Sequence, residues 1–212
     1  MDNRLLRLAR ATKGFMPDDE GLALYAAGLE AGKLGPLLEI GSYCGKSAIY
    51  LGSAAQENGS VLFSIDHHRG SEENQPGWEY HDPELVDPAS GLLDTWPCFR
   101  RTIAEAGLDQ HVAAFVARSE QLARHWCAPL ALVFIDGGHS EEAVRADFTG
   151  WFPHLVAGGS LVIHDVFPDP AQGGQAPYNV YREALSSGDF VDTGAAGSLR
   201  VLRRLGTETN GR

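Results

Sequence analysis

The sequence predicts an α/β protein whose sheet has seven strands, is doubly wound and mostly parallel, and ends in an antiparallel hairpin. Five short apolar runs alternate with segments of helical spacing, which is typical of a parallel sheet covered by helices. Two further apolar runs follow each other near the C-terminus without a helix between them, which predicts antiparallel pairing at the sheet edge. With 212 residues and no internal repeat, residues 1–212 are expected to form a single domain.

The chain begins with two helical segments. Residues 1–15 intersperse arginines among leucines and predict an amphipathic helix, because they lack the continuous apolar core of a signal peptide or membrane span. From Pro17, a proline and three acids precede apolar residues at helical spacing and then glycines, as in a helix with both ends marked. We therefore expect residues 1–34 to form an N-terminal helical extension.

The apolar runs predict strands that are buried on both faces. Those of the parallel part are 36–41, 60–66, 111–117, 130–136 and 159–165. The helical segments are 45–57, 92–106, 119–127, 140–150 and 178–187. The hairpin strands are 189–194 and 198–204, and the chain from about Gly206 is expected to be a tail.

Two connections are longer than usual. Residues 67–91 and 166–177 are rich in proline, glycine, acids and aromatic residues. Loops of this length usually carry function, and both follow strand carboxyl ends, where open α/β sheets bind ligands. With their flanking residues, 67–98 and 166–178 are expected to be substrate-side loops.

Charge and cysteine content limit the class of partner and the compartment. The 17 lysines and arginines against 28 acids give a net charge of −11, which opposes binding to nucleic acid or to an anionic membrane. A small molecule or neutral polymer is the expected partner. The three cysteines form no C-x-x-C pair, so neither a disulfide framework nor a structural zinc site is indicated, which suits a reducing cytoplasm.

The stretch "EIGSYCGKS" (39–47) is a glycine-rich turn between a predicted strand and a helix. A phosphate-binding P-loop needs four residues between its first glycine and the Gly-Lys pair, whereas Gly41 and Gly45 have three between them. A nicotinamide-binding turn would read G-x-G-x-x-G, which is also absent. Asp66 ends the next strand, where a carboxylate can accept both hydroxyls of a ribose. A nucleoside site is indicated, and a P-loop hydrolase stays an alternative because "ALVFID" resembles its second strand motif.

The pattern E-x-G-x-x-x-G resembles the first motif of class I S-adenosylmethionine (SAM) dependent methyltransferases, and the resemblance covers residues 35–204. It implies a Rossmann-like fold and SAM as cofactor. Carried onto this chain, it implies that Glu39, Gly41 and Gly45 line the methionine part, Ser47 lies near its carboxylate, Asp66 holds the ribose, and Arg118 and Ser119 lie on the adenine side. Simpler interpretations are a strand-end salt bridge for Glu39 and a helix cap for Arg118 and Ser119.

Acids and histidines follow the fourth and fifth predicted strands. Asp136 ends one strand and His139 comes three residues later, while His164 and Asp165 end the next strand. If these strands are neighbours, the four side chains converge at the carboxyl edge of the sheet. Carboxylates and an imidazole in one cleft are a plausible cage for Mg²⁺ or Mn²⁺.

This arrangement resembles metal-dependent O-methyltransferases of small molecules and sugars, which carry D-x-x-H after strand four and an acidic pair after strand five. The chain departs from that pattern by having His164 where the second acid would stand. The resemblance implies that Asp136, His164 and Asp165 hold the metal, with Asp136 also beside the cofactor, and that His139 takes the hydroxyl proton as general base. In simpler interpretations His139 is a loop residue and Asp136 orients backbone amides, while His67 and His68 are solvated.

Aromatic residues in the long loops suggest the acceptor. Trp78, Tyr80 and Trp96 alternate with acids, and such rings can stack on sugar C–H faces or pack the loop onto the core. The stretch "DHHRGSEENQPGWEYHDP" resembles small actinobacterial methyltransferases that act on methylmannose polysaccharides at the anomeric hydroxyl. We therefore expect a small-molecule or oligosaccharide hydroxyl acceptor, with a homodimer closing the loops; a catalytically silent SAM-binding subunit is a further alternative.

Overall fold

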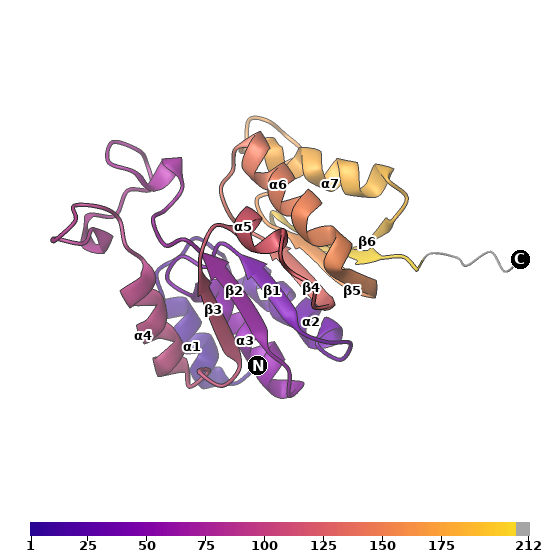
Figure 1. Cartoon of the computed structure of the whole chain (residues 1–212), viewed down its shortest axis with the longest axis horizontal. Helices are drawn as coiled ribbons and strands as arrows, with labels where there is room; N and C mark the ends of the chain where they lie inside the picture. The colour runs from indigo at the N-terminus through magenta and orange to yellow at the C-terminus, as the bar shows by residue number, and fades with distance from the viewer. Residues whose placement is uncertain (207–212) are drawn as a thin grey trace, which may run out of the picture.

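The central feature of the fold is one seven-stranded sheet in the order β3-β2-β1-β4-β5-β7-β6 (Figure 1). The computed structural model describes residues 1–206. The strands are β1 (Leu37–Ile40), β2 (Leu62–Asp66), β3 (Val112–Val116), β4 (Leu130–Ile135), β5 (Leu155–Ile163), β6 (Phe190–Ala196) and β7 (Leu199–Arg204). Strands β1 to β5 are parallel, and β7 is antiparallel to both β5 and β6. The predicted α/β class, the Rossmann-like mostly parallel sheet and the terminal hairpin are confirmed.

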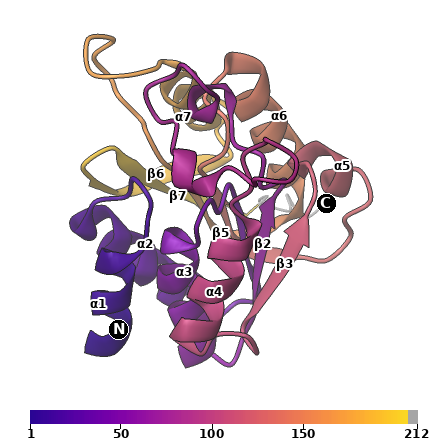
Figure 2. The same ribbon diagram turned by 90° about the vertical axis from the view of Figure 1, so that its left-hand side faces the viewer.

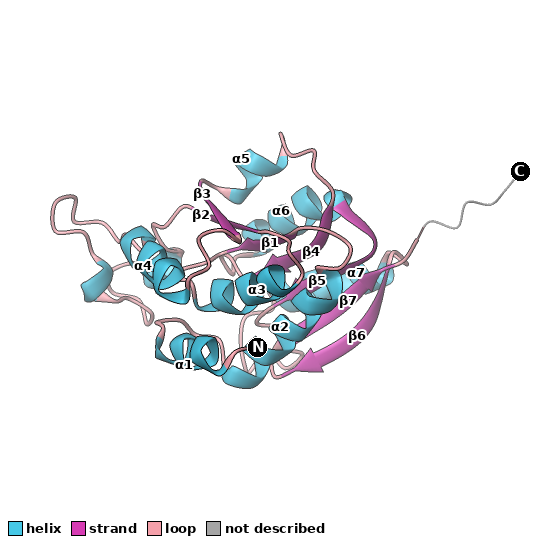
Figure 3. Cartoon of the chain, turned by 90° about the horizontal axis from the view of Figure 1, so that it is seen from below, coloured by secondary structure: helices cyan, strands magenta, loops and turns pink. Residues whose placement is uncertain are grey.

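Helices cover both faces of this sheet (Figure 3). They are α1 (Asn3–Ala11), α2 (Asp18–Ala31), α3 (Lys46–Glu57), α4 (Trp96–Ala106), α5 (Ser119–Ala123), α6 (Glu141–Trp151) and α7 (Ala176–Ser186), with 3₁₀ turns η1 (Glu72–Asn74), η2 (Pro83–Leu85) and η3 (Phe152–His154). The first four α-helices bury apolar residues against one face, and α5, α6 and α7 do so against the other. Successive strand residues alternate between the two cores because side chains point to opposite faces.

Four elements differ most from the sequence expectation, and one of them is helix α4, which begins at Trp96 instead of residue 92. Strand β3 is at the sheet edge and is only partly buried, so the expectation of burial on both faces was wrong for it. Strand β5 begins at Leu155 instead of Gly159, through an irregularity in its pairing with β4 that the glycines at 158 and 159 concealed. Helix α5 ends at Ala123, four residues before the predicted end.

The N-terminal helices lie against the sheet rather than apart from it. Leu5 and Ala9 of α1 and Leu24 of α2 are buried in the same core as α3. In residues 1–206, no helix combines the length and apolar character that spanning a membrane requires. Of the expected C-terminal tail, 207–212 fall outside the described residues.

The two long connections lie at the same edge of the sheet. Figure 2 shows the segments that follow β2 and β5 on the side toward which the arrows of β2 and β3 point. Residues 67–95 connect β2 to α4, and residues 164–175 connect β5 to α7. Parallel strands deliver their carboxyl ends to one edge, so both loops border the residues that follow β1 and β4.

Gly41 allows the segments that follow β1 and β4 to approach each other closely. Its φ is +85°, and a Cβ atom there would lie 2.1 Å from the carbonyl oxygen of Asp136. We expect Gly41→Ala to lower the free energy of unfolding by at least about 2 kcal/mol more than Gly59→Ala, because overpacking adds to the backbone strain. Gly59 is a matched control with φ +62° and no atom within 4 Å of a built Cβ. Urea unfolding of both variants measures the difference, and equal losses would mean that the contact with Asp136 relaxes at no cost.

Candidate active site

Most of the predicted site residues lie in or just after four neighbouring strands, and Arg118 and Ser119 follow the edge strand β3. Strands β2, β1, β4 and β5 are adjacent in that order, so the expectation that strands four and five are neighbours is confirmed. In residues 1–206, the non-glycine residues with positive φ are Tyr43, His68 and Asp165, and each directly follows or lies near one of these strand ends. Strained backbone conformations of this kind cluster at functional sites.

Asp66 anchors the glycine-rich turn in this structure. Its Oδ2 accepts hydrogen bonds from the backbone N–H groups of Ser42 (3.0 Å) and Tyr43 (2.9 Å), and its Oδ1 accepts one from His68 (2.7 Å). The carboxylate expected to hold a ribose therefore also shapes the turn between β1 and α3. Gly45, with φ +90°, ends this turn at the N-terminus of α3, where free N–H groups favour an anionic group.

Glu39 and Ser42 present buried polar atoms beside the turn. Glu39 is fully buried in β1, where its Oε1 accepts a hydrogen bond from the Ser64 hydroxyl at 2.6 Å. Within residues 1–206, Glu39 Oε2 and Ser42 Oγ have no hydrogen-bond partner. Burial raises the pKa of Glu39 to about 8, and the nearby carboxylates of Asp136 and Asp66 add to the rise, while the Ser64 hydrogen bond opposes it. A cationic ligand here would favour the ionised carboxylate.

The other expected cofactor residues differ in accessibility. Ser47 is buried in the first turn of α3, whereas Lys46 is half-buried with its Nζ 3.5 Å from the carbonyl oxygen of Gly14. Arg118 is exposed. The hydroxyl of Ser119 is buried, donates to the Asp147 carboxylate and accepts from Trp151 Nε1 (3.0 Å), so this side chain is held in a structural network.

Three acid and histidine side chains converge after β4 and β5. One donor atom each from Asp136, His139 and Asp165 lies within 4.8 Å of the other two. His139 Nε2 is 3.0 Å from Asp165 Oδ2, yet it is buried without a hydrogen bond of acceptable geometry among residues 1–206. Ligand atoms at about 2.1 Å from an octahedral cation are about 3.0 Å apart along an edge. A donor set of two carboxylates and one imidazole suits a divalent cation, and binding of that cation would release the second proton of the imidazole.

The carboxylates around His139 determine its charge. Asp165 is the main cause that raises the pKa of His139 to about 9, with Glu73 adding to the rise and burial opposing it. Burial favours the neutral acid at Asp165, but the two histidines outweigh it and hold its pKa well below the usual range.

His164 does not belong to this donor set. Its Nδ1 lies 2.9 Å from Asp136 Oδ1, and its Nε2 lies 2.5 Å from Glu20 Oε2. Ionised carboxylates only accept hydrogen bonds, so both nitrogens of His164 donate in this structure. Burial opposes this charge, but Asp136, Asp165 and Glu20 outweigh it and raise the pKa of His164. The donor set that the geometry groups is Asp136, His139 and Asp165, and ligation of the metal by His164 stays a prediction.

Two acids at the site were missed by sequence reasoning. Glu73, in η1 of the long loop, lies 3.0 Å from His139 Nδ1 through its Oε2, and can fix which ring nitrogen carries a proton. Glu20, in the first turn of α2, holds His164 from the other side. No local signal separated Glu73 from the other acids of its loop, or Glu20 from the acids that favour a helix N-terminus.

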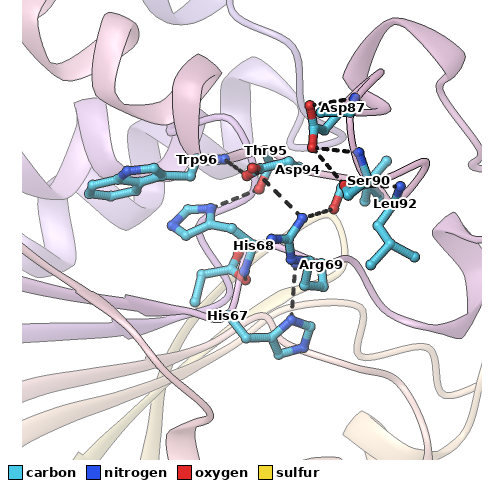
Figure 4. Close-up of polar contacts among 12 residues, drawn as sticks. His67, His68, Arg69, Asp87, Ser90, Leu92, Asp94, Thr95 and Trp96 are labelled. Carbon is cyan, nitrogen blue, oxygen red and sulfur yellow. Dashed lines mark hydrogen bonds and ion pairs between the residues drawn. The ribbon is translucent and has the colours of Figure 1, made fainter.

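The long loop is closed at its base by polar contacts (Figure 4). His68 is buried, and its Nδ1 lies 2.7 Å from Thr95 Oγ1, just before α4. Arg69 donates to the carbonyl of Leu93 and lies 3.7 Å from Asp94. The expectation that His68 is solvated was wrong, because it joins the two ends of the loop.

The loop aromatics divide into two groups. Trp96 packs against the rings of His68 and Phe99, so it joins the loop to the core and is not free to stack on a sugar. Trp78 and Tyr80 keep 53 % and 43 % of their surface exposed.

Comparison with known proteins supplies an independent finding. The profile of a family described as a methyltransferase domain matches residues 38–166. These residues begin in β1 and end just after Asp165, so they include the glycine-rich turn and both acid-histidine segments.

Solved structures with the same fold cover nearly all of the chain. The O-methyltransferase TomG from Streptomyces achromogenes, involved in tomaymycin synthesis and solved with SAM, has a TM-score of 0.66 at 18% identity, over 97% of this chain and 91% of TomG. An O-methyltransferase from Bacillus cereus solved with S-adenosylhomocysteine (SAH) has a TM-score of 0.64 at 16% identity, over 96% and 92% of the two chains. A protein from Corynebacterium glutamicum has a TM-score of 0.67 at 16% identity, over 99% and 93%. At these identities the likeness shows the fold.

Proposed function

The chain belongs to the methyltransferase domain family, and from this premise we propose that it is a SAM-dependent, divalent-metal-assisted O-methyltransferase acting on a sugar or glycosylated small molecule. The observation that carries the proposal is the meeting, at one sheet edge, of the glycine-rich turn with the donor set of Asp136, His139 and Asp165. SAM or SAH in the solved structures of TomG and the Bacillus cereus enzyme supports the cofactor.

The residues around the turn fit SAM. The unsatisfied oxygens of Glu39 and Ser42 are buried polar atoms that a bound cationic amino acid moiety can pair. The N-terminus of α3 at Gly45 suits its carboxylate. Asp66 is the candidate ribose acceptor, and Arg118 with the backbone at Ser119 borders the expected adenine side.

Methyl transfer to a hydroxyl requires that the negative charge developing on the acceptor oxygen be stabilised. When bound, SAM supplies the methyl group and a divalent cation stabilises negative charge that develops on the hydroxyl oxygen. Asp136, His139 and Asp165 would hold that cation, and Glu73 would keep the proton of His139 on Nδ1 so that Nε2 faces the site. This assigns His139 as a ligand, in place of the base expected from sequence, so the proton of the acceptor hydroxyl would be lost to solvent once the cation has lowered the pKa of that hydroxyl.

The acceptor class is proposed from the loop surface. Trp78 and Tyr80 offer exposed aromatic faces in a loop that also supplies Glu73, and Phe15 packs edge-on against Tyr80 with ring centres 5.1 Å apart. Such faces suit the C–H surface of a sugar ring. The specific acceptor we propose is the 1-hydroxyl of a methylated mannoside. We also propose that the chain is a single domain, that it forms a homodimer, and that it acts in the cytoplasm.

The first test is thermal stabilisation by SAH. At about 100 times its dissociation constant, SAH should add about 2.7 kcal/mol, which is on the order of 5–10 °C for a domain of this size. ATP and NAD, at equal concentration, are expected to give no shift. Stabilisation by ATP alone would contradict the proposal and restore the P-loop alternative.

Turnover then separates the enzyme from a silent SAM-binding subunit. Methyl transfer to glycosides with a free anomeric hydroxyl is measured with Mg²⁺, with Mn²⁺ and after chelation. Transfer that survives complete metal removal would exclude the metal-assisted form of the proposal.

A further inference from the structure

Glu20, a buried acid of the N-terminal extension, contacts His164 on the side of the ring that faces away from Asp136. Glu20 of α2 is 3 % exposed, whereas its neighbour Asp19 is exposed to solvent. Its Oε2 lies 2.5 Å from His164 Nε2, and its Oε1 accepts a hydrogen bond from the backbone N–H of Ser198. Three segments far apart in the sequence meet at this one carboxylate.

The hairpin between β6 and β7 is shaped to fit this carboxylate. Gly197 has φ +48°, and a Cβ atom there would lie 2.1 Å from Glu20 Oε1. A side chain at position 197 would therefore displace the Glu20 carboxylate, and the backbone conformation there favours glycine. With Ser198 and His164, both oxygens of Glu20 are occupied, so its orientation is fixed.

The contacts continue from Glu20 through His164 to the donor set. His164 is 6 % exposed, and its second nitrogen, Nδ1, donates to Asp136 Oδ1 at 2.9 Å, with Asp165 Oδ2 at 3.3 Å. The ring of His164 thus bridges Glu20 on one side and Asp136 on the other. Carboxylates that coordinate metals are commonly held in this way by an outer layer of hydrogen bonds.

We infer that Glu20 is a positioning residue for the candidate metal site, acting through His164 on Asp136. It fixes the orientation of the His164 ring so that Nδ1 holds Asp136 Oδ1, which leaves the other oxygen of Asp136 for the cation. The metal-binding part of this inference rests on the proposed function. Its simpler rival is that Glu20 only fastens α2 to the hairpin at Ser198.

The affinity for Mn²⁺, measured by electron paramagnetic resonance of the purified full-length protein, separates these roles. Glu20→Gln keeps the volume but offers one acceptor to two donors, so we expect a 10- to 100-fold higher dissociation constant, the range found for outer-layer partners. Asp19→Asn, one residue away and exposed, is the matched control and should bind Mn²⁺ as the wild type does. A folded Glu20→Gln variant with unchanged Mn²⁺ affinity would overturn the inference.

Nuclear magnetic resonance of the imidazole N–H protons tests the same inference without relying on metal affinity. The wild type should show two slowly exchanging signals from His164, identified by their loss in His164→Asn. In Glu20→Gln the Nε2–H signal should vanish and the Nδ1–H signal should move or broaden. An Nδ1–H signal that stays unchanged would overturn the positioning role, even if the wild type binds no Mn²⁺ and the metal part of the proposed function fails.

If Glu20→Gln does not fold, the His164 signals of the wild type, recorded with and without Mg²⁺, test the inference. Both His164 signals should persist when Mg²⁺ is added to saturation, because both nitrogens remain bonded to carboxylates. Loss of one signal on addition of Mg²⁺ would mean that His164 ligates the cation directly, and the inference would be wrong.

Discussion

Asp165→Asn is expected to weaken Mn²⁺ binding by more than about 100-fold, since even residues behind the ligands change metal affinity about 10- to 100-fold. Methyl transfer should fall by about 100- to 1000-fold, the usual cost of removing one group that stabilises developing charge. Asparagine suits this position because Asp165 has φ +55°, a conformation that asparagine tolerates. Isothermal calorimetry with Mn²⁺ and an initial-rate assay measure the two effects.

SAH binding should remain in the same variant, because Asp165 lies in the metal donor set and not at the glycine-rich turn. The matched control is Asp169→Asn, an exposed acid in the same loop, which should change neither Mn²⁺ binding nor the rate. Loss of SAH binding in Asp165→Asn would mean that the substitution disturbs the whole sheet edge. Normal Mn²⁺ affinity with a folded protein would remove Asp165 from the metal site.

The same assays distinguish the two roles of His139. A ligand predicts that His139→Gln loses Mn²⁺ affinity together with activity, whereas a general base predicts lost activity at unchanged affinity. We expect the first result, because His139 Nε2 lies 3.0 Å from Asp165 Oδ2 without a hydrogen bond of acceptable geometry among residues 1–206.

Local sequence patterns were enough to place the strand-end residues. Asp66, Asp136 and Asp165 each end or follow an apolar run, and parallel strands carry such positions to one edge whatever the details of packing. The absence of a helix between the last two apolar runs also identified the antiparallel hairpin. The boundary error at β5 arose beside Gly158 and Gly159, where the pairing of β5 with β4 is irregular.

The outer layer of the site could not be predicted, because its contacts join distant segments. Glu20 and His164 are 144 positions apart, and Glu73 and His139 are 66 apart. The dipeptide at 164–165 did not indicate which side chain would face the donor set. Asp66 shows the same limit, since its hydrogen bonds to the turn depend on the strained conformation of Tyr43.

The free energy of unfolding should fall as the pH rises from the ordinary pKa of a glutamate to the raised pKa of the buried Glu39. Burial raises the pKa of Glu39 from the ordinary 4.5 to about 8, so between these values the folded protein holds a proton that the unfolded chain has lost. The unfolded state then binds fewer protons, and the free energy of unfolding decreases with rising pH across this window. At about 1.4 kcal/mol per pKa unit, the full effect is up to roughly 5 kcal/mol.

Glu39→Gln isolates this contribution, because the histidines with raised pKa also lower stability at high pH. The variant should be more stable than the wild type near pH 8 and close to it near pH 5, as measured by urea unfolding at both values. Glu105→Gln, an exposed acid on α4, is the control and should show no such difference. A Glu39→Gln variant that loses stability equally at both pH values would show that the carboxyl is a hydrogen-bonding group whose charge does not matter.

SAM binding should reverse this preference of Glu39 for its proton. A cationic ligand beside the buried carboxyl favours ionisation, so binding at pH 7 should release a proton to the buffer. Calorimetry in two buffers of different ionisation enthalpy measures this release, which should disappear in Glu39→Gln. If wild type and variant release equal numbers of protons, Glu39 does not face the cationic part of the cofactor, and its burial in β1 serves only the packing of the sheet against the glycine-rich turn.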